Sequence, residues 1–522
     1  MLRSRLYADP DNLFVHDVIL ASCRYLGEKT ALVDSSCARR ISYAEYGSMV
    51  ESLARGFLAA GLKPGEVLAI HLANCWEFCA AYHAATLAGA VPTLLNPTYR
   101  EREARYQLQN SSTAMLITDG PNIDGVGLSG LPDLRRVFTI RQKASGAEPF
   151  AELMQPVTAT LPGSPRSSGE TLAALPYSSG TTGLPKGVML SHRNLIANVY
   201  QLVGPNGSPF VAQDTFLCFL PLYHIYGLNV VLNPALALGA TLVLMPRCNI
   251  PQLLSLLIEE GVTTMPVVPP ALNLLCQAAE AGQFPKDHRL HWVKSGAAPL
   301  APDLARRFTS LTGVLVCQGY GMTEASPVTH VGYLQPELYR PESIGQPLVQ
   351  TECCVLDEMA NELCAGSSGE LVMRGPQFML GYWKSPEATA TALRDGWFWS
   401  GDIVRRDECD FYYVVDRRKE MIKYKGFPVA PAEVESLLME HPAVRDCGVV
   451  GRPETSAGEI PVAFVVLREG LVASKKLEDE LCGFVADRLS HYKQPREIRF
   501  IQAVPKTASG KILRRELRKL FA

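Results

Sequence analysis

Apolar and polar positions alternate with two different periods along the first part of the chain. Between Ile41 and Asp119, some segments repeat apolar residues every three or four positions, as helices do, and others are short apolar runs typical of strands. The predicted helices are 43–62, 76–90 and 100–110, and the predicted strands are 67–72, 91–95 and 114–119. This order predicts an α/β architecture with a largely parallel sheet.

The same alternation resumes further along the chain, with predicted strands at 241–246 and 290–296 around a helix at 251–261. After Glu370 the pattern changes to short β-rich segments. These lead into a charged segment at 416–426, which is interpreted as a linker. The remaining part, roughly a hundred residues, holds helix and strand signals sufficient for a small α+β domain.

Length and charge narrow the choice of function. At 522 residues the chain is too long for one compact core, so two or more domains are expected. The 50 Lys and Arg against 52 Asp and Glu leave a formal net charge of -2. Such a balance provides no overall field for nucleic acid or an anionic membrane, so any anion must be bound at a local site.

The 14 cysteines show no C-x-x-C pair and no Cys/His metal spacing. No apolar leader follows Met1, and the many unpaired thiols indicate a reducing compartment, so a cytoplasmic protein is expected. A membrane-spanning helix needs an apolar run of about eighteen residues, and no run in this chain approaches that length. No membrane span is therefore expected.

A segment rich in glycine and hydroxyl residues, SSGTTGLPKG at 178–187, lies between two apolar strand-like runs. Its backbone N–H groups can turn toward one anion and Lys186 adds a positive charge, as a triphosphate cradle requires. The Walker pattern needs glycine where this chain has Pro185, and serine or threonine where it has Gly187, so the loop is of another type. Taken alone, the segment could also be a flexible surface turn.

A second segment, QGYGMTE at 318–324, follows a strand-like run and begins like a dinucleotide fingerprint, but Glu324 stands at the third glycine position. A turn presenting Tyr320, Thr323 and Glu324 offers an aromatic face for a base, a hydroxyl for a phosphate and a carboxylate for Mg²⁺. Read alone, it is equally compatible with an ordinary β-turn.

Two further residues are ambiguous by themselves. Asp402 in WSGDIV could be a turn carboxylate. Lys511 opens a basic segment of the kind that usually forms a solvated helix face. The preceding Gly510 nevertheless places this lysine on a flexible loop tip from which it could reach an active site.

Together and in this order, these segments resemble the adenylate-forming superfamily of acyl-CoA synthetases, luciferases and peptide-synthetase adenylation domains, and most of all the 4-coumarate:CoA ligases. The similarity extends from about Leu32 to Leu517. Its blocks are YSSGTTGLPKGVMLSH, PLYHIYGLN, KSGAAPL, QGYGMTEASPV, GELVMRGPQFMLGYW, GWFWSGD, VDRRKEMIKYKGFPVAP and PKTASGKILRR.

The resemblance implies an ATP-dependent acid:CoA ligase that uses Mg²⁺, forms an acyl-AMP from an aryl, cinnamic-type or medium-chain carboxylic acid, and transfers the acyl group to coenzyme A. It also implies a large N-terminal domain of βαβ-type subdomains at 1–415, a hinge at 416–420 and a small mobile α+β C-terminal domain at 421–522. The active site would lie between the two domains.

The resemblance further implies roles for individual residues. The implied phosphate-binding residues are Ser178, Ser179, Gly180, Thr181, Thr182, Gly183 and Lys186. The implied adenine turn comprises Gln318, Gly319, Tyr320 and Gly321, followed by Thr323 at a phosphate, Glu324 as Mg²⁺ ligand, and Asp402 with Arg417 at the ribose. Lys511 would bind carboxylate and α-phosphate oxygens, Lys419 would be the hinge, and Lys423 with Gly426 would serve thioester formation. The implied catalytic residues are Lys511, His224, Thr323 and Lys423.

The implied acid pocket comprises Tyr223, His224, Val230, Lys294, Gly296, Ala297, Ala298, Pro327 and Val328. His224 could instead be a satisfied core histidine. Adenylation domains for amino acids place an aspartate in this region, and YHIYGLNVVL has none. Because a buried ammonium without a partner is costly, an α-amino acid is not the expected substrate.

Two positions depart from the resemblance. Val230 stands where plant 4-coumarate:CoA ligases tend to carry a small hydroxyl residue, which puts recognition of a ring hydroxyl in doubt. Pro428 replaces a glutamine common in those ligases and in luciferases, so a contact from that side chain is lost.

Other functions stay open at this point. The chain could load a separate carrier protein, could be an oxidative, luciferase-like enzyme, or could be a non-catalytic acyl- or nucleotide-binding protein. The sequence stops at Ala522, five residues after the last matched segment, so no fused carrier domain is expected. The presence of Lys186, Glu324, Asp402 and Lys511 favours catalysis over binding alone.

Overall fold

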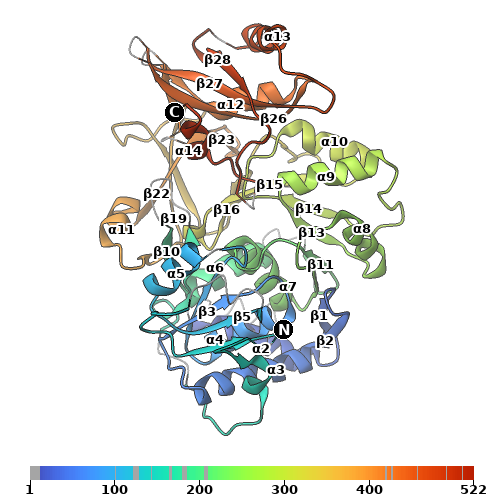
Figure 1. The fold of residues 1–522 in the computed structure, drawn as a ribbon, viewed down its shortest axis with the longest axis vertical. Coiled ribbons are helices and arrows are strands. Elements are labelled where there is room, and N and C mark those ends of the chain that lie inside the picture. Colours follow the sequence, from blue (N-terminus) through green and yellow to red (C-terminus); the bar gives the residue numbers. More distant parts are fainter. Residues whose placement is uncertain are drawn as a thin grey trace.

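Two sheets with mostly parallel strands form the centre of the N-terminal part of the molecule (Figure 1). The computed structural model describes residues 12–99, 101–120, 128–142, 144–163, 167–178, 185–204, 210–417, 420–424, 427–454, 457–489, 491–507 and 510–521. The larger sheet has nine strands in the order β17-β16-β15-β14-β13-β11-β12-β1-β2. The second has five strands in the order β4-β3-β5-β6-β7.

The strands of the nine-stranded sheet are β1 (Thr30–Asp34), β2 (Arg39–Ser42), β11 (Thr215–Cys218), β12 (Thr241–Leu244), β13 (Thr264–Val267), β14 (Trp292–Ser295), β15 (Val316–Gly321), β16 (Val328–Val331) and β17 (Gln346–Pro347). Those of the second sheet are β3 (Val67–His71), β4 (Val91–Leu94), β5 (Thr113–Thr118), β6 (Arg136–Thr139) and β7 (Glu148–Pro149).

The helices around these sheets are α2 (Val15–Leu26), α3 (Tyr43–Ala59), α4 (Trp76–Leu87), α5 (Glu101–Asn110), α6 (His192–Val203), α7 (Asn233–Leu238), α8 (Ile250–Glu259), α9 (Pro269–Glu280), α10 (Pro302–Thr312) and α11 (Pro386–Ala392). Short helices are η3 (Phe150–Met154), the π-helix η4 (Gly227–Leu232) and η5 (Thr323–Ala325). Helix α4 is buried from Trp76 to Thr86, which explains why its sequence is apolar on all sides.

Two antiparallel sheets complete the N-terminal part. One comprises β8 (Leu172–Ala174), β9 (Tyr177–Ser178), β10 (Lys186–Ser191) and β20 (Gly381–Tyr382). The other comprises β18 (Glu352–Leu356), β19 (Ser368–Arg374), β21 (Leu393–Arg394), β22 (Trp397–Arg406) and β23 (Tyr412–Arg417).

The C-terminal part has its own sheet, in the order β25-β24-β27-β26 with β28 beside β27, and it forms one end of the molecule in Figure 1. Its elements are β24 (Ile422–Tyr424), β25 (Phe427–Val429), α12 (Pro431–Met439), β26 (Val444–Glu454), β27 (Gly458–Leu467), α13 (Lys475–Ala486), η6 (His491–Lys493), β28 (Glu497–Phe500) and α14 (Arg514–Lys519).

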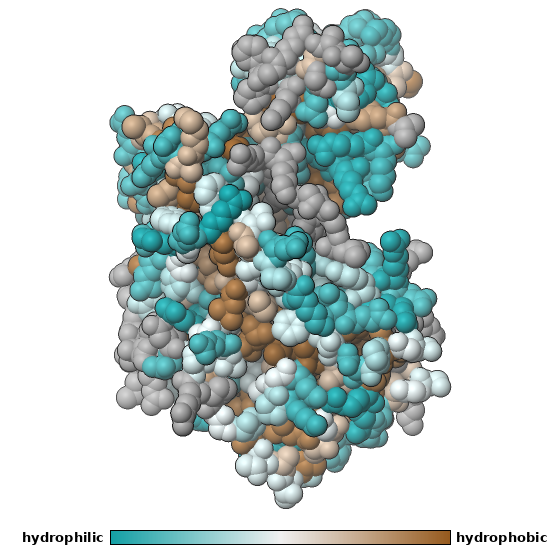
Figure 2. Space-filling model, turned by 90° about the vertical axis from the view of Figure 1, so that its left-hand side faces the viewer, coloured by the Kyte–Doolittle hydropathy of each residue, from teal (hydrophilic) through white to brown (hydrophobic). Residues whose placement is uncertain are grey.

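Hydrophobic packing separates the same two parts. One large cluster of buried side chains runs from Val15 to Tyr412, whereas two other clusters lie entirely within residues 422–521. In the space-filling view, a hollow sets the C-terminal end apart on one side, and apolar residues gather in a band across the body below it (Figure 2). The α/β fold with a large N-terminal and a small C-terminal domain is therefore confirmed.

The helices and strands expected from the apolar pattern are confirmed to within a few residues, for example α3, β3, α4 and β5. The charged segment 416–426, predicted as a linker, includes the end of β23 at 416–417 and all of β24, with 418–419 and 425–426 outside the described residues. The exact hinge and domain limits stay a prediction. Within the described part of the chain, no helix combines the length and apolar character needed to cross a bilayer.

Candidate active site

The phosphate loop connects two paired strands. Strand β9 ends at Ser178 and β10 begins at Lys186, and these two residues face each other in the antiparallel register. The loop is also tied from outside, because the Tyr106 hydroxyl donates to the carbonyl of Pro185 at 2.9 Å. Five of the predicted phosphate-binding residues, Ser179, Gly180, Thr181, Thr182 and Gly183, lie outside the described residues.

Glu324 lies beside the base of this loop. Its Oε1 accepts hydrogen bonds from the Ser178 hydroxyl at 3.1 Å and from the Tyr382 hydroxyl at 2.8 Å. The Lys186 ammonium lies 5.1 Å from the centroid of the Tyr382 ring. Burial, with the Glu324 charge beside it, raises the pKa of Tyr382 well above its usual value, so its hydroxyl keeps its proton and remains a donor.

Tyr382 is a site residue that the sequence analysis missed. Tyr382 lies on strand β20. It is brought next to Lys186 and Glu324 because β20 pairs with β10, the strand that begins at Lys186. The available signal was the GYW ending of a matched block, GELVMRGPQFMLGYW. Nothing in its local sequence distinguishes this tyrosine from a core aromatic residue.

The residues of the predicted adenine turn, 318–321, do not form a turn but belong to strand β15, and the end of this strand closely approaches a second chain segment. A Cβ added at Gly321 would fall 1.9 Å from the carbonyl oxygen of Pro327, so only glycine fits at this position. The Met322 N–H donates to the same carbonyl at 2.8 Å. This contact joins the turn that follows β15 to Pro327 and Val328 of the predicted acid pocket, and half-buried Thr323 begins η5 directly after it.

Gln318 has a supporting position in the structure. Its buried amide accepts a hydrogen bond from the Leu300 N–H at 3.2 Å and donates to the Pro341 carbonyl at 2.8 Å. The side chain therefore holds together two loops at the end of β15.

Tyr320 and Asp402 come together across two different sheets. The Tyr320 hydroxyl donates to Oδ2 of Asp402 at 2.5 Å, and Asp402 is buried. On the neighbouring strand β23, Arg417 lies directly opposite Asp402 in the register. The adenine turn and the two predicted ribose residues are thus adjacent, although the Arg417 side chain is outside the described part.

The residues of the predicted acid pocket lie around η4 and the ends of β14 and β15. The Tyr226 hydroxyl donates to the Lys294 carbonyl at 3.1 Å, and its ring lies about 3.1 Å from where a Cβ on Gly296 would be. The buried Asn229 amide donates to the carbonyl of Ser326 at 2.6 Å, next to Pro327. Val230, only 5% exposed, follows it on the same π-helix.

Lys294 is enclosed by protein, and its side chain crosses from β14 toward β15. A Cβ at Gly319 would lie 2.3 Å from its Cε and 3.1 Å from its Nζ, so the missing side chain of Gly319 makes room for the lysine. Burial lowers the pKa of Lys294 to about 8, and the Cys317 thiol partly offsets this shift. The pocket wall and the adenine turn therefore share one cationic side chain.

His224 and Tyr223 begin the predicted pocket. The Nδ1 atom of His224 accepts a hydrogen bond from the Tyr226 N–H at 3.2 Å, which leaves the proton of the neutral ring on Nε2. Surrounding protein lowers the pKa of His224 to about 4, although the side chain keeps accessible surface. The ring is therefore a neutral, accessible hydrogen-bond donor at pH 7, unlike a fully satisfied core histidine. Burial likewise raises the pKa of Tyr223 to about 12.

The turn that carries Lys511 lies against the N-terminal domain. Gly510 has a φ of 84°, and a Cβ there would fall 2.7 Å from Cγ of Pro270, the second residue of α9. The turn is closed by hydrogen bonds between Thr507 and Lys511, with the Thr507 N–H donating to the Lys511 carbonyl at 2.9 Å. Lys511 is thus presented by a backbone that docks on the larger domain.

The remaining predicted residues are placed less fully. Lys423 lies on β24 in the C-terminal sheet, far in sequence from the turn that carries Lys511. Its side chain is outside the described part. The same holds for the side chain of Pro428 on β25, while Lys419 and Gly426 are not described at all. Ala297 is exposed with a φ of 68°, and Ala298 is half-buried beside it.

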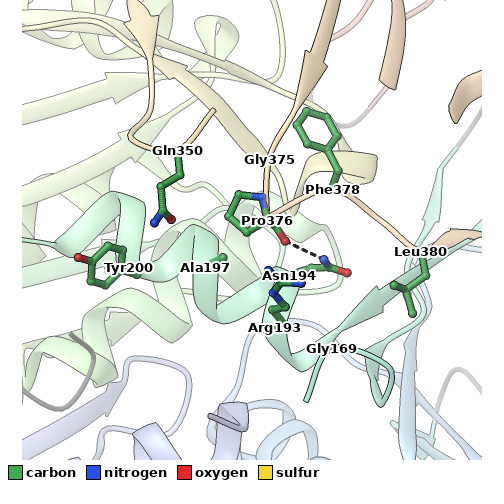
Figure 3. Close-up of a pocket in the computed structure, with 10 residues that line it drawn as sticks. All are labelled: Gly169, Arg193, Asn194, Ala197, Tyr200, Gln350, Gly375, Pro376, Phe378 and Leu380. Carbon is green, nitrogen blue, oxygen red and sulfur yellow. Dashed lines mark hydrogen bonds between the residues drawn. The ribbon is translucent and has the colours of Figure 1, made fainter. Parts of the chain in front are cut away.

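A separate cavity of about 440 Å³ lies beside α6 (Figure 3). Four of its lining residues come from α6 and the others from three neighbouring segments; they are Gly169, Arg193, Asn194, Ala197, Tyr200, Gln350, Gly375, Pro376, Phe378 and Leu380. In this view the Asn194 amide reaches the Pro376 carbonyl at 2.8 Å, which joins the helix to the loop after β19. None of the residues predicted from the sequence lines this cavity.

Glu324 is the carboxylate positioned for a cation near the phosphate loop. Two hydroxyl donors hold one of its oxygens, and the residue is only half-buried, which fits a single carboxylate ligand to a Mg²⁺ that keeps waters and phosphate oxygens. Among the described residues, no group of three or more His, Cys, Asp or Glu side chains could hold a metal by itself.

Comparison with known proteins agrees with this geometry. Residues 21–383 match the family model of the AMP-binding enzymes, and residues 433–511 match the model of the AMP-binding enzyme C-terminal domain. The chain belongs to the AMP-binding enzyme family. The first match covers all the pocket and adenine-turn residues described above, and the second ends at Lys511.

Relatives of this family align over nearly the whole chain. A 4-coumarate–CoA ligase 5 from Oryza sativa is 37% identical over 100% of this chain and 97% of its own length. An anthranilate CoA ligase in complex with anthranoyl-AMP has a TM-score of 0.88 at 26% identity, covering 98% of this chain and 97% of its own. The ATP-bound MatB from Rhodopseudomonas palustris has a TM-score of 0.87 at 27% identity, covering 98% and 99%.

Proposed function

We propose that this protein is an ATP-dependent, AMP-forming acid:CoA ligase. It joins a carboxylic acid to AMP, releases pyrophosphate, and then transfers the acyl group to the thiol of coenzyme A. Curated relatives of this length and similarity are 4-coumarate–CoA ligases, and a solved relative holds an aryl-AMP, which supports an acid of the aryl or cinnamic type. A medium-chain acid is the alternative within the same reaction.

The observation that carries the proposal is the shared wall between acid pocket and adenine turn. Strand β14 supplies Lys294 to the pocket, its neighbour β15 supplies Gly319 and Tyr320 to the turn, and the Lys294 side chain contacts Gly319. A carboxylic acid and a nucleotide bound at these two places would be neighbours. Adenylation needs this proximity, because holding two reactants together removes much of the entropic barrier of a bimolecular step.

Charge repulsion is the main chemical obstacle to the first step. A carboxylate must approach an anionic α-phosphate, and the transition state gathers negative charge on the phosphate oxygens. Mg²⁺ held by Glu324 would supply charge neutralisation when bound. Lys186 beside the phosphate loop and Lys511 on its docked turn are the cations of this chain that we assign to the same task, with Lys511 at the reacting oxygens.

The roles of the other residues follow from their positions. Tyr382 and Ser178 orient the Glu324 carboxylate, and Tyr320 and Asp402 with Arg417 bind the nucleoside. His224 donates from Nε2 at the entrance of the acid pocket. Thr323 contacts a phosphate oxygen. Lys423 and Gly426 act in thioester formation after the C-terminal domain turns about Lys419.

The test is product identification with a panel of acids. Purified protein is incubated with ATP, Mg²⁺ and cinnamic, 4-coumaric, benzoic or C6 to C12 acids, with and without CoA, and AMP, ADP, pyrophosphate and acyl-CoA are measured. The proposal expects AMP, pyrophosphate and a CoA thioester. ADP would indicate a kinase-type reaction, AMP without any thioester would indicate a carrier-protein acceptor, and no turnover with any acid would indicate a binding protein.

A further inference from the structure

Arg514 forms a buried ion cluster in the C-terminal domain. Its side chain is 10% exposed, and Nη2 donates to both carboxylate oxygens of Glu435 at 2.9 and 2.7 Å. Nη1 donates to the carboxylate of Glu420, and Nε donates to the Val449 carbonyl at 3.1 Å. The guanidinium is therefore engaged on every nitrogen, in the bidentate geometry that only arginine provides.

The partners of Arg514 lie close to the predicted hinge. Glu420 is the first described residue after 418–419, and its carboxylate is 13% exposed. Asp416, on β23, precedes the predicted hinge residue Lys419, and its Oδ2 accepts a hydrogen bond at 2.9 Å from the Ala432 N–H in the first turn of α12. Asp416 is attracted by Arg514 and repelled by Glu435. One cation thus binds Glu420, which follows Lys419, and attracts Asp416, which precedes it.

Arg514 also lies next to the catalytic turn. It begins α14, three residues after Lys511, and the turn that carries Lys511 is closed just before this helix by the bridge between Lys506 and Ile512. The far side of this turn meets Pro270 through Gly510. The orientation of Lys511 therefore depends on where α14 is held relative to the hinge segment and to α12.

We infer that Arg514 is a positioning residue for acyl-adenylate formation. Its bonds to Glu420 and Glu435 fix α14, and with it the Lys511 turn, to the hinge-side end of the C-terminal domain, so that Lys511 reaches the reacting oxygens when the turn docks on Pro270. Without the guanidinium, three buried carboxylates would repel one another and the tie would open. This inference rests on the proposed function.

The decisive measurement separates the two half-reactions. Acyl-AMP formation is followed as acid-dependent pyrophosphate release, and thioester formation is followed from preformed acyl-AMP and CoA. In Arg514→Lys, which keeps the charge but loses the bidentate bond, the first rate should fall by roughly tenfold or more, because small misplacements of a reacting group are costly. The second rate should stay within about twofold, since Lys511 does not serve that step.

Glu420→Gln is the second variant, because it keeps the shape of the hinge-side partner and leaves the Glu435 pair intact. In this variant too, the rate of acyl-AMP formation should fall while the rate of thioester formation stays nearly unchanged, but the fall should be smaller than in Arg514→Lys. Arg515→Met is the matched control, since it removes a cation from the adjacent, exposed position of α14, and both of its rates should stay within about twofold.

Equal losses in both half-reactions of Arg514→Lys and Glu420→Gln would show a purely structural role and overturn the inference, as would unchanged rates in both. Failure of the proposed function is distinguishable, because the unaltered protein would then release no AMP with any acid. A variant that does not fold is recognised by its circular dichroism spectrum, and the other variant then decides.

Discussion

Lys294 keeps a costly position for a charged side chain. Protein encloses it, only 2% of it is exposed, and burial lowers its pKa from 10.5 to about 8. Each unit of such a shift corresponds to about 1.36 kcal/mol, so the charged form at pH 7 opposes folding by about 3 kcal/mol at most. Retaining a lysine at this cost, where the acid pocket meets the adenine turn, suits a contact with a bound anion.

Replacing Lys294 by methionine should therefore stabilise the protein. Between pH 8 and 10.5 the unfolded chain binds one proton more than the native state, so the stability of the unaltered protein rises with pH in this window. We expect Lys294→Met to raise the free energy of unfolding at pH 7 by about 1–3 kcal/mol, with the gain shrinking toward pH 10. Urea unfolding at pH 7, 8.5 and 10 measures this; a gain independent of pH would place the pKa of Lys294 elsewhere.

Val230 belongs to another wall of the predicted acid pocket. Its side chain is buried on η4, and an apolar wall leaves a substrate hydroxyl without its water hydrogen bonds, at a cost of about 1–3 kcal/mol. Val230→Ser should restore part of this, so that kcat/KM for 4-coumarate rises relative to that for cinnamate. If the ratio changes by less than about twofold, equivalent to roughly 0.4 kcal/mol, Val230 does not face the polar end of the ring.

At the scale of elements, the junction of β15 and β16 positions the residues proposed to bind the nucleotide. The adenine-turn residues 318–321 form the end of β15; the chain then passes through Met322 and η5 and returns along β16 in antiparallel pairing. The return places the Pro327 carbonyl against Gly321, and the pairing places Tyr320 where its hydroxyl meets Asp402 of β22. A small displacement of this junction would therefore move both the adenine turn and the acid pocket.

Gly321→Ala tests the closeness of that junction. Its Cβ would meet backbone atoms of Pro327 and Val328 at 1.9 and 2.9 Å, and backbone cannot move aside as a flexible side chain can. We expect a loss of about 1–3 kcal/mol in stability and a raised KM for ATP.

The matched control for Gly321→Ala is Gly483→Ala. Gly483 lies within α13 with no neighbouring atom within 4 Å of the added Cβ. This variant should gain about 0.5–1 kcal/mol at unchanged activity. Thermal unfolding and ATP-dependent AMP release compare the two, and equal behaviour of both variants would contradict the close approach.

At the scale of the whole molecule, two separately packed bodies meet at the turn that carries Lys511. The C-terminal clusters lie within residues 422–521 and can keep their packing while the domain turns. In the arrangement described here, the Lys511 turn meets Pro270, whereas Lys423 belongs to a different strand of the same small domain. A rotation of this domain would replace the face that carries Lys511 by the face that carries Lys423 at the proposed acid pocket.

Lys511→Ala should consequently affect the two half-reactions unequally. In the role proposed for Lys511, the ammonium serves only the transition state of acyl-AMP formation, so that rate should fall by roughly 100-fold or more. Thioester formation from supplied acyl-AMP should stay within a few fold of the unaltered protein. Single-turnover measurement of each half-reaction checks this, and comparable losses in both would contradict a division of labour between faces.

Much of the architecture and the reaction class could be predicted from the sequence alone. Segments such as 67–72 and 76–90 have the apolar patterns of a strand and a helix, and they became β3 and α4, because burial in a sheet or between layers demands those patterns locally. The ordered blocks from 178 to 511 identified the family and placed Lys186, Glu324, Asp402 and Lys511 in it. The compartment and the individual site roles stay predictions.

Only the tertiary structure decided which of these residues touch. Tyr382 reaches Glu324 across 58 positions because β20 pairs with β10, and Lys294 meets Gly319 because β14 lies beside β15. The cluster of Arg514 with Glu420 joins residues 94 positions apart. Such contacts depend on sheet register and domain docking. The local apolar periodicity shows which side of a helix or strand is buried. It does not show which other element that side packs against, so it cannot predict these contacts.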